Sequence, residues 1–291
     1  MANLSGMEVW SFLEMAGLIL FFEGSGISFL ANFLIIVIHS IYHIQITGTI
    51  ICYTYLQMSI PLEKPNLSVI MPAYNEAGNV EIVISKAISY LDNFAEHYEI
   101  IMINDGSTDD TGKIIKRLAE SNPKIHPIHH PQNQGYGAAV RSGFREARMD
   151  YIFLTDADGQ FDFQELTEVF PHLTESDFII GYRLTRQDAY YRKINTYLWN
   201  VLCRIIFRTR VKDIDCAFKL FKRQILDSIE LKANGAMVST ELLIKARKAG
   251  FKIVEMGVHH YPRLTGKASG ANPRVVYRAF KEIIQLYPEL H

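Results

Sequence analysis

The pattern of apolar residues changes near residue 60. From Leu67 onward, short and nearly continuous apolar runs alternate with segments in which apolar residues recur every three or four positions. Such runs are typical of strands covered on both faces, and such recurrence is typical of amphipathic helices. The predicted strands are 67–72, 99–104, 124–130, 151–156 and 177–182, and the predicted helices are 77–95, 110–121, 135–148 and 163–173. This alternation predicts an α/β fold with a doubly wound, mostly parallel sheet.

Polar residues gather where three of these strands end. The segments are "PAYNE" (72–76), "NDGSTDD" (104–110) and "DADGQFD" (156–162). Each segment alone also fits a turn or a helix cap. Because ligands of doubly wound sheets bind beyond the carboxyl ends of the strands, their joint occurrence favours a binding site.

The segment after the fourth strand predicts a metal ion. The apolar run 151–154 is followed by Asp156, Asp158 and Asp162. Side chains two residues apart at a strand end point the same way. Like charges so close repel one another unless a cation lies between them.

The first 60 residues have a different composition from the rest. They contain no Lys or Arg, and no residue between Glu23 and Glu63 is formally charged. The apolar stretch 27–44 approaches the roughly 20 residues of a membrane-spanning helix. Three interpretations compete: a membrane anchor, which is favoured; a buried helical hairpin; or a true start at Met58. Because the first basic residues follow the stretch, an anchor would leave the bulk of the chain, including 66–287, in the cytoplasm.

Charge and cysteine content exclude some classes of protein. The 291-residue chain has a net charge of −1, which argues against nucleic acid as the main partner. Cys52, Cys203 and Cys216 lack the spacing of a zinc site or a disulfide framework, so we expect reduced thiols.

The motifs together resemble glycosyltransferase family 2. They are "VIMPAYNE", "INDGSTDDT", "NQGYGAAVRSGF", "TDADGQFD", "GYR" and "DIDCAFKLFKR". The dolichyl- or polyprenyl-phosphate sugar synthases look most similar, over about 66–287. The resemblance implies a GT-A fold, a nucleotide-sugar donor, a divalent metal and inversion at the anomeric carbon.

The resemblance also implies a donor site. Mg²⁺ or Mn²⁺ would be held by Asp156 and Asp158 with Gln160 as a neutral helper, and would neutralise the diphosphate leaving group. Asp156 is expected to face the donor as well. The residues expected around the nucleoside are Pro72, Tyr74, Glu76, Asn104, Asp105, Gly135, Tyr136 and Gly137. Asn104 replaces an acid of the family motif, which leaves the identity of the base open.

The catalytic candidates are Arg183, Asp213 and Asp215. Arg183 is expected either to bind phosphate oxygens or to form a buried salt bridge. Asp213 or Asp215 is expected to act as general base, with Glu241 as a third candidate and helix capping as the alternative.

The acceptor is inferred from positive charge near the C-terminus. The segment 259–274 carries Arg263, Lys267 and Ser269 and indicates an anion-binding loop, although a solvated loop has the same composition. A phosphate monoester needs positioning more than deprotonation, so a lipid phosphate is the preferred acceptor. The helical stripe in 187–210 fits either a membrane surface or the sheet. The alternatives are a glycan hydroxyl acceptor and a nucleotide-sugar-binding protein without transferase activity.

Overall fold

A computed structural model describes residues 63–184, 190–209, 211–263, 265–266 and 273–291. The expected apolar helical extension within 1–60, the start at Met58, Lys267 and Ser269 lie outside these ranges. In the described part, no helix combines the length and apolar character needed to cross a membrane.

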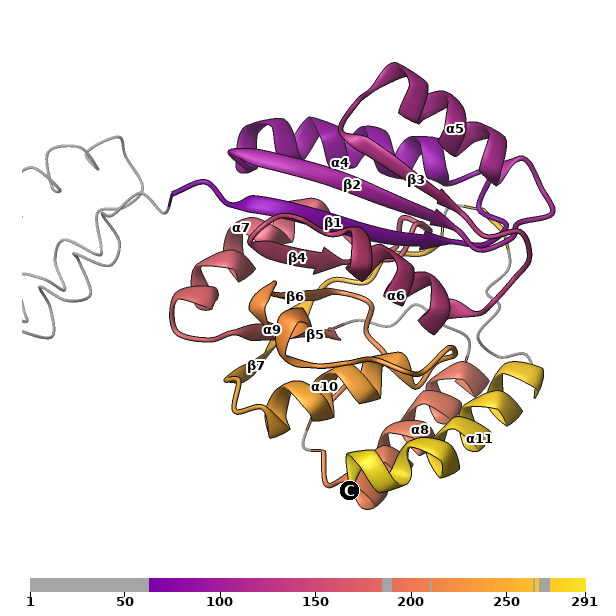
Figure 1. Cartoon of the computed structure of the whole chain (residues 1–291), viewed down its shortest axis with the longest axis vertical. Helices are drawn as coiled ribbons and strands as arrows, with labels where there is room; N and C mark the ends of the chain where they lie inside the picture. The colour runs from indigo at the N-terminus through magenta and orange to yellow at the C-terminus, as the bar shows by residue number, and fades with distance from the viewer. Residues whose placement is uncertain (1–62, 185–189, 210, 264, 267–272) are drawn as a thin grey trace, which may run out of the picture. The chain divides into compact units, whose positions relative to one another are not determined.

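Seven strands form one mixed sheet in the order β3-β2-β1-β4-β6-β5-β7 (Figure 1). The strands are β1 Asn66–Ala73, β2 His97–Asn104, β3 Ile125–His129, β4 Tyr151–Leu154, β5 Phe178–Arg183, β6 Lys219–Lys222 and β7 Ile253–Val258. All neighbouring pairs are parallel except the two made by β6, which runs antiparallel to both β4 and β5. The predicted α/β class and mostly parallel sheet are confirmed.

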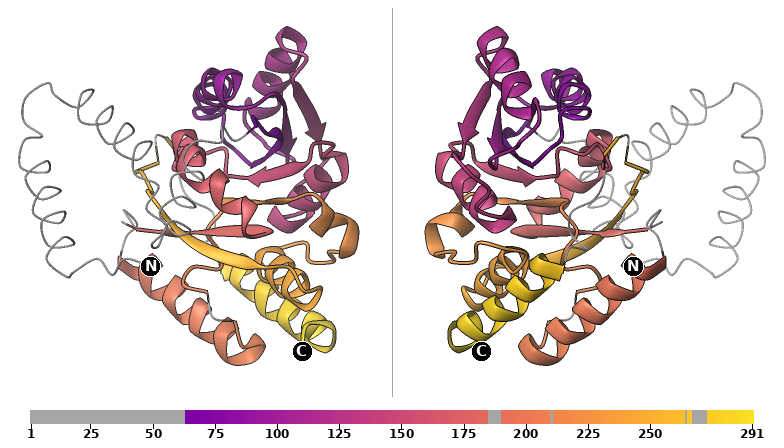
Figure 2. Two further views of the ribbon diagram at one scale, coloured as in Figure 1. Left: turned by 90° about the vertical axis from the view of Figure 1, so that its left-hand side faces the viewer. Right: turned by 90° about the vertical axis from the view of Figure 1, so that its right-hand side faces the viewer.

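Helices cover both faces of the sheet. They are α4 Val80–Phe94, α5 Thr111–Ser121, α6 Tyr136–Glu146, α7 Leu166–Val169, α8 Tyr190–Phe207, α9 Gln224–Ser228, α10 Val238–Lys248 and α11 Pro273–Leu290. The buried residues of α4 and α5 belong to one core cluster, and those of α6, α8, α10 and α11 belong to the other. Figure 2 shows the same division, with α8 and α11 on the side away from α4 and α5.

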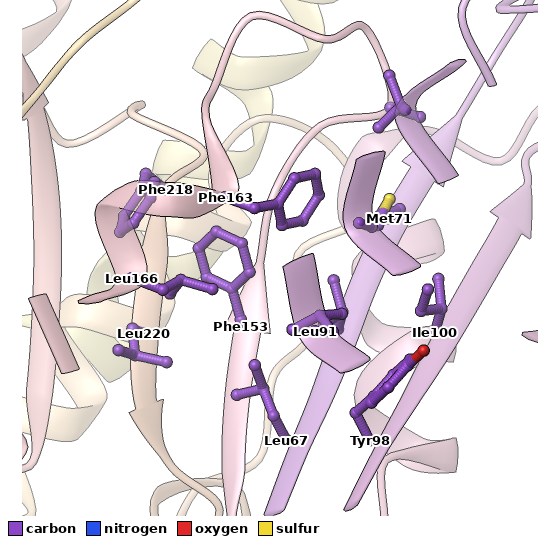
Figure 3. Packing of buried hydrophobic residues seen from close by; sticks show 14 of the residues in the cluster. Leu67, Met71, Leu91, Tyr98, Ile100, Phe153, Phe163, Leu166, Phe218 and Leu220 are labelled. Carbon is purple, nitrogen blue, oxygen red and sulfur yellow. The ribbon is translucent and has the colours of Figure 1, made fainter. Parts of the chain in front are cut away.

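The core around β4 is built mainly from aromatic and branched side chains. Phe153 is 1% exposed, and its ring centroid lies 4.7 Å from that of Phe218 on the loop leading into β6 and 6.1 Å from that of Phe163. Leu67 and Leu91 complete the packing between β1 and α4 (Figure 3). Burying side chains of this size stabilises the fold by about 1.5–3 kcal/mol each, so this core rigidly supports the strand ends described below.

The elements differ from the prediction in three places. The expected strand β3 lies at the sheet edge, and it is not continuously buried: Ile125 is buried, whereas Pro127 and His129 are exposed. The predicted helix 163–173 is confirmed only in part: α7 is its α-helical middle and is flanked by two short 3-10 helices, the second of which contains Pro171, which has no N–H to continue the α-helical ladder. Strands β6 and β7 were not predicted.

Candidate active site

The loops after β1 and β2 are joined by hydrogen bonds. The Asn75 backbone N–H donates to Ser107 Oγ (3.0 Å), and Asn75 Oδ1 accepts from the Thr108 N–H (2.8 Å). The Glu76 N–H donates to Thr111 Oγ1 (2.8 Å). Asn75 has φ +58°, a value that Asn tolerates better than most residues. These bonds bring together two of the three polar strand ends noted in the sequence.

A guanidinium links the loop after β4 to the loop after β1. Arg263 Nη2 donates to Glu76 Oε1 (2.5 Å) and to Asp158 Oδ2 (3.2 Å). Glu76 and Asp158 are 8% and 6% exposed. Burial is the main cause of a raised pKa at Glu76, which the bonds from Asn79 and Arg263 partly counteract. Arg263, expected to bind an anionic substrate, thus lies on two carboxylates of the expected donor site.

Arg263 belongs to a segment that crosses the site, which we call the strap (residues 259–263 and 265–266). The Tyr261 N–H donates to the Gln160 carbonyl (2.9 Å), and Gln160 Nε2 donates to the Tyr261 carbonyl (3.0 Å). The Thr265 N–H and hydroxyl both donate to Asn79 Oδ1, at 3.1 and 2.8 Å. The strap is therefore fixed at both ends, and the amide nitrogen of Gln160 is engaged by it.

Asp156 lies beside Asp158 and Tyr136. Burial, and next the charge of Asp158, raise the pKa of Asp156 from 3.8 to about 7. Burial, and next the charge of Asp156, raise the pKa of Tyr136 well above its usual value of 10. The repulsion expected between Asp156 and Asp158 is present in the structure, and a divalent cation between them would relieve it.

These carboxylates suit a magnesium or manganese ion that is also bound by its substrate. Within the described ranges, no three His, Cys, Asp or Glu side chains are grouped as a complete metal site. Mg²⁺ usually keeps several waters and binds one or two carboxylates together with substrate phosphates. Asp158 Oδ1 accepts a backbone N–H, that of Gln160 (3.1 Å). Asp156 and Asp158 therefore fit such an ion once the hydrogen bond from Arg263 to Asp158 Oδ2 is broken.

Arg183 and Asp213 form a bidentate ion pair next to this group. Arg183 Nε and Nη2 donate to the two oxygens of Asp213 at 2.6 and 2.7 Å, and both side chains are nearly buried. Burial alone would lower the pKa of Arg183, but the bonds and charge of Asp213 outweigh it and raise that pKa. Of the two sequence-based alternatives for Arg183, the salt bridge is the one that the structure contains.

Asp215, which is partly buried, and Lys219, which is fully buried, are opposite charges that influence each other's pKa. Burial, and next the charge of Asp213, raise the pKa of Asp215 from 3.8 to about 6. Burial also lowers the pKa of Lys219, which is 0% exposed and donates to the Cys216 carbonyl. The sequence analysis did not identify Lys219. Its signal is a single cationic residue inside the apolar run 216–221, where a charge needs a partner.

Asp105 holds the loop that leads into α6. Its oxygens accept from the N–H groups of Gln134 and Gly135, both at 2.9 Å, and one lies 2.7 Å from His130 Nδ1. Asn104 Oδ1 accepts from the Ser107 N–H at 3.0 Å, and its amide nitrogen lies 3.2 Å from His129 Nδ1. Both residues thus shape the loops around the expected nucleoside, with Tyr74 38% exposed and Pro72 inside β1.

Gly135 and Gly137 are needed for close backbone contact. A Cβ on Gly135, at φ +106°, would lie 2.6 Å from the Asn234 carbonyl, and one on Gly137 would lie 2.6 Å from the Gly235 carbonyl. The loop 232–235 is held in turn by Glu241, which accepts from the N–H groups of Lys232 and Ala233 and pairs with Lys245 at 2.7 Å. Glu241 is 0% exposed, so its contacts support a structural role instead of the general-base role considered above.

The C-terminal helix is joined to the same loops. Arg278 Nη2 donates to the Gln134 carbonyl (2.8 Å), and Glu282 Oε1 accepts from the Gly235 N–H (2.7 Å). Helix α11 therefore contacts, through its inner face, the segment that precedes Tyr136.

Comparison with known proteins gives relatives along most of the described chain. The family model "Glycosyl transferase family 2" matches residues 68–230. Glycosyltransferase AglD of Haloferax volcanii is 30% identical over 207 residues, which cover 68% of this chain and 33% of that protein. The dolichyl-phosphate beta-glucosyltransferase of Dictyostelium discoideum is 30% identical over 220 residues, covering 68% and 67%. The undecaprenyl-phosphate 4-deoxy-4-formamido-L-arabinose transferase of Pectobacterium atrosepticum is 28% identical, covering 69% and 61%.

This chain therefore matches between a third and two thirds of the length of these relatives. One similar solved structure is glucosyl-3-phosphoglycerate synthase of Mycobacterium tuberculosis in complex with Mn²⁺, uridine diphosphate and glucosyl-3-phosphoglycerate. It has a TM-score of 0.58 at 21% identity, and the match covers 77% of this chain and 78% of that one. Mannosyltransferase PcManGT of Pyrobaculum calidifontis, in complex with GDP-Man and Mn²⁺, has a TM-score of 0.54 at 18% identity, covering 82% and 74%. At these identities the likeness is one of fold. By its family match and its relatives, the chain belongs to glycosyl transferase family 2.

Proposed function

We propose that this chain is an inverting glycosyltransferase that moves a sugar from a nucleoside diphosphate sugar to a polyprenyl phosphate. The observation that carries the proposal is the meeting of the β1, β2 and β4 loops at buried carboxylates, chiefly Glu76 and Asp158. Relatives named for dolichyl phosphate and undecaprenyl phosphate support the acceptor class.

Asp156 and Asp158 would hold Mg²⁺ or Mn²⁺, which neutralises charge on the departing diphosphate. Arg263, displaced from Asp158 Oδ2, stays within the site as a cation for phosphate oxygens. The acceptor phosphate is already anionic, so the chain mainly has to orient it for one in-line displacement. The roles of Pro72, Tyr74, Asn104 and Tyr136 around the nucleoside are part of this proposal.

A proton left on the acceptor phosphate would pass to a carboxylate. Asp213 is engaged on both oxygens by Arg183. Asp215 has a pKa raised to about 6, close to the value that suits a general base at neutral pH. Asp215 is therefore the stronger of the two candidates.

Because polyprenyl phosphates reside in bilayers, we place the protein at a membrane with its catalytic part on the cytoplasmic side. The basis is the chain's sequence, in which Lys and Arg first appear after the apolar stretch 27–44.

A donor and acceptor panel tests the proposal. Purified full chain is incubated with UDP- or GDP-sugars and Mn²⁺, and with polyprenyl phosphate or a soluble glycan, and products are identified by mass spectrometry. We expect transfer to the lipid phosphate, and a loss of at least 100-fold in Asp158→Asn. Asp162→Asn is the matched control, because the Asp162 side chain caps a short helix by accepting the Gln164 N–H (3.0 Å). Transfer to the glycan alone, or full activity of Asp158→Asn, would refute the proposal.

A further inference from the structure

The outer sides of α8 and α11 expose large apolar side chains. This surface, which we call the α8–α11 face, consists of Leu198, Ile205, Tyr277, Phe280, Ile284 and Tyr287. Ile205 and Ile284 are 73% and 75% exposed. The members recur at intervals of three, four and seven residues, so that they form one stripe on each helix.

The two stripes belong to one surface because the helices touch. The rings of Trp199 and Phe280 meet edge to face at 6.2 Å between centroids, and those of Phe207 and Tyr287 lie 6.4 Å apart. The inner sides of both helices are already buried, with Cys203 on α8 and Ile283 on α11 in the same core cluster. In the described domain the side chains of the α8–α11 face stay exposed, and Figure 2 shows both helices at the outside of that domain.

Exposed cations border this face. Arg204 lies beside it on α8, Arg208 directly follows α8, and Lys281 lies beside it on α11. The exposed acid described on these helices, Glu289, is paired with Lys232 at 2.7 Å. A second copy of the chain docked through the same face would bring like charges together, which disfavours self-association. An apolar stripe between cations is suited to acyl chains and anionic headgroups.

We propose that the α8–α11 face docks on the surface of an anionic lipid bilayer. Ile205 and Ile284 lie among the acyl chains just below the headgroups, and Arg204, Arg208 and Lys281 lie at the lipid phosphates. Docking would bring the protein to the surface at which a polyprenyl phosphate is presented. In this respect the inference rests on the proposed function. Through Arg278 and Glu282, the same helix contacts the loops beside the donor site.

An environment-sensitive dye placed on the face tests the docking directly. In full chain with Cys52 replaced by Ser, nitrobenzoxadiazole is attached to Ile284→Cys or, as a matched control, to Ile82→Cys. Ile82 is 45% exposed on α4, on the other face of the sheet, and Cys203 and Cys216 are buried. With vesicles containing phosphatidylglycerol we expect a blue shift and a several-fold rise in emission at position 284, weaker with pure phosphatidylcholine and absent at position 82.

Three results would overturn the docking. The dye at 284 could respond to vesicles no more than the dye at 82. Its emission could already be blue-shifted before vesicles are added, at every protein concentration, which would mean that another segment of this chain covers the face. Its emission could rise with protein concentration alone, which would mean that a second copy covers it.

A kinetic measurement separates docking from the proposed function. We expect Ile205→Glu with Ile284→Glu to raise the apparent KM for polyprenyl phosphate in vesicles at least fivefold, and to leave turnover of a short, water-soluble prenyl phosphate within twofold. Ile82→Glu should change neither. If no acceptor receives sugar from wild-type protein, the proposed function fails, whereas the dye result still decides the docking. If transfer occurs and the dye at 284 is silent, the docking fails alone.

Discussion

The raised pKa of Asp215 gives a prediction about stability and pH. Its pKa rises from 3.8 to about 6 in the folded protein, mainly through burial. Well below pH 3.8 the carboxyl is protonated in both states and does not affect stability. As pH rises through 4 to 6, the unfolded chain loses its proton while the folded protein retains it, so wild type loses stability. A shift of about two units corresponds to about 3 kcal/mol once both forms are ionised.

Asp215→Asn removes this titration, because the amide is neutral at every pH. The variant should therefore gain about 2 kcal/mol of unfolding free energy relative to wild type between pH 4.5 and pH 7.5. Urea unfolding followed by far-ultraviolet circular dichroism at both pH values measures the difference. Asp227→Asn, on the exposed surface of α9, is the control and should stay within about 0.5 kcal/mol of wild type at both.

An advantage of Asp215→Asn that does not grow with pH would refute the reasoning. It would mean that Lys219 and Arg183 already compensate the ionised carboxylate fully. Turnover is a separate readout: if Asp215 accepts the proton from the acceptor, the variant loses activity while it gains stability.

Three further predictions follow from single contacts. Arg263→Ala removes the cation that competes with Mn²⁺ for Asp158, so Mn²⁺ should bind about tenfold more tightly, as measured by calorimetry without nucleotide. Unchanged or weaker Mn²⁺ binding would contradict this prediction. Arg117→Ala, which breaks an exposed ion pair with Glu81, is the control. Phe153→Ala should lower the free energy of unfolding, measured by urea titration, by about 3–5 kcal/mol. A loss below about 1 kcal/mol would show that the surrounding side chains fill the cavity left by the phenyl ring. Glu241→Gln should destabilise by about 1–3 kcal/mol while the folded fraction keeps its turnover, whereas normal stability with lost turnover would make Glu241 the base.

The sequence predicted the parts of the fold that depend on local pattern. Strands β1, β2 and β4 are continuous apolar runs, so their ends, and the meeting of the loops that follow, could be placed in advance. Strand β6 has only four residues and two lysines, and β7 is interrupted by Glu255 and Gly257. Their place in the sheet comes from pairing with distant strands, which periodicity does not encode.

The same limit applies to the candidate site. Residue type and position indicated that Glu76, Asp105, Asp158, Arg183 and Arg263 belong to one region, but not how they pair. Arg263 contacts carboxylates, and Asp105 turns toward the backbone of 134–135. Such pairings depend on distances between segments up to 187 residues apart in sequence.

The insertion of β6 between β4 and β5 sets an order for folding during synthesis. Strands β3, β2, β1 and β4 can assemble as soon as residue 154 has left the ribosome, but the second edge of β4 then stays open until residues 219–222 arrive. That edge carries Ile152, Phe153 and Leu154, and an open apolar edge invites pairing with other nascent chains. Chaperone dependence should therefore peak for ribosome-bound chains whose emerged part ends between these two points and fall once β6 has left the ribosome.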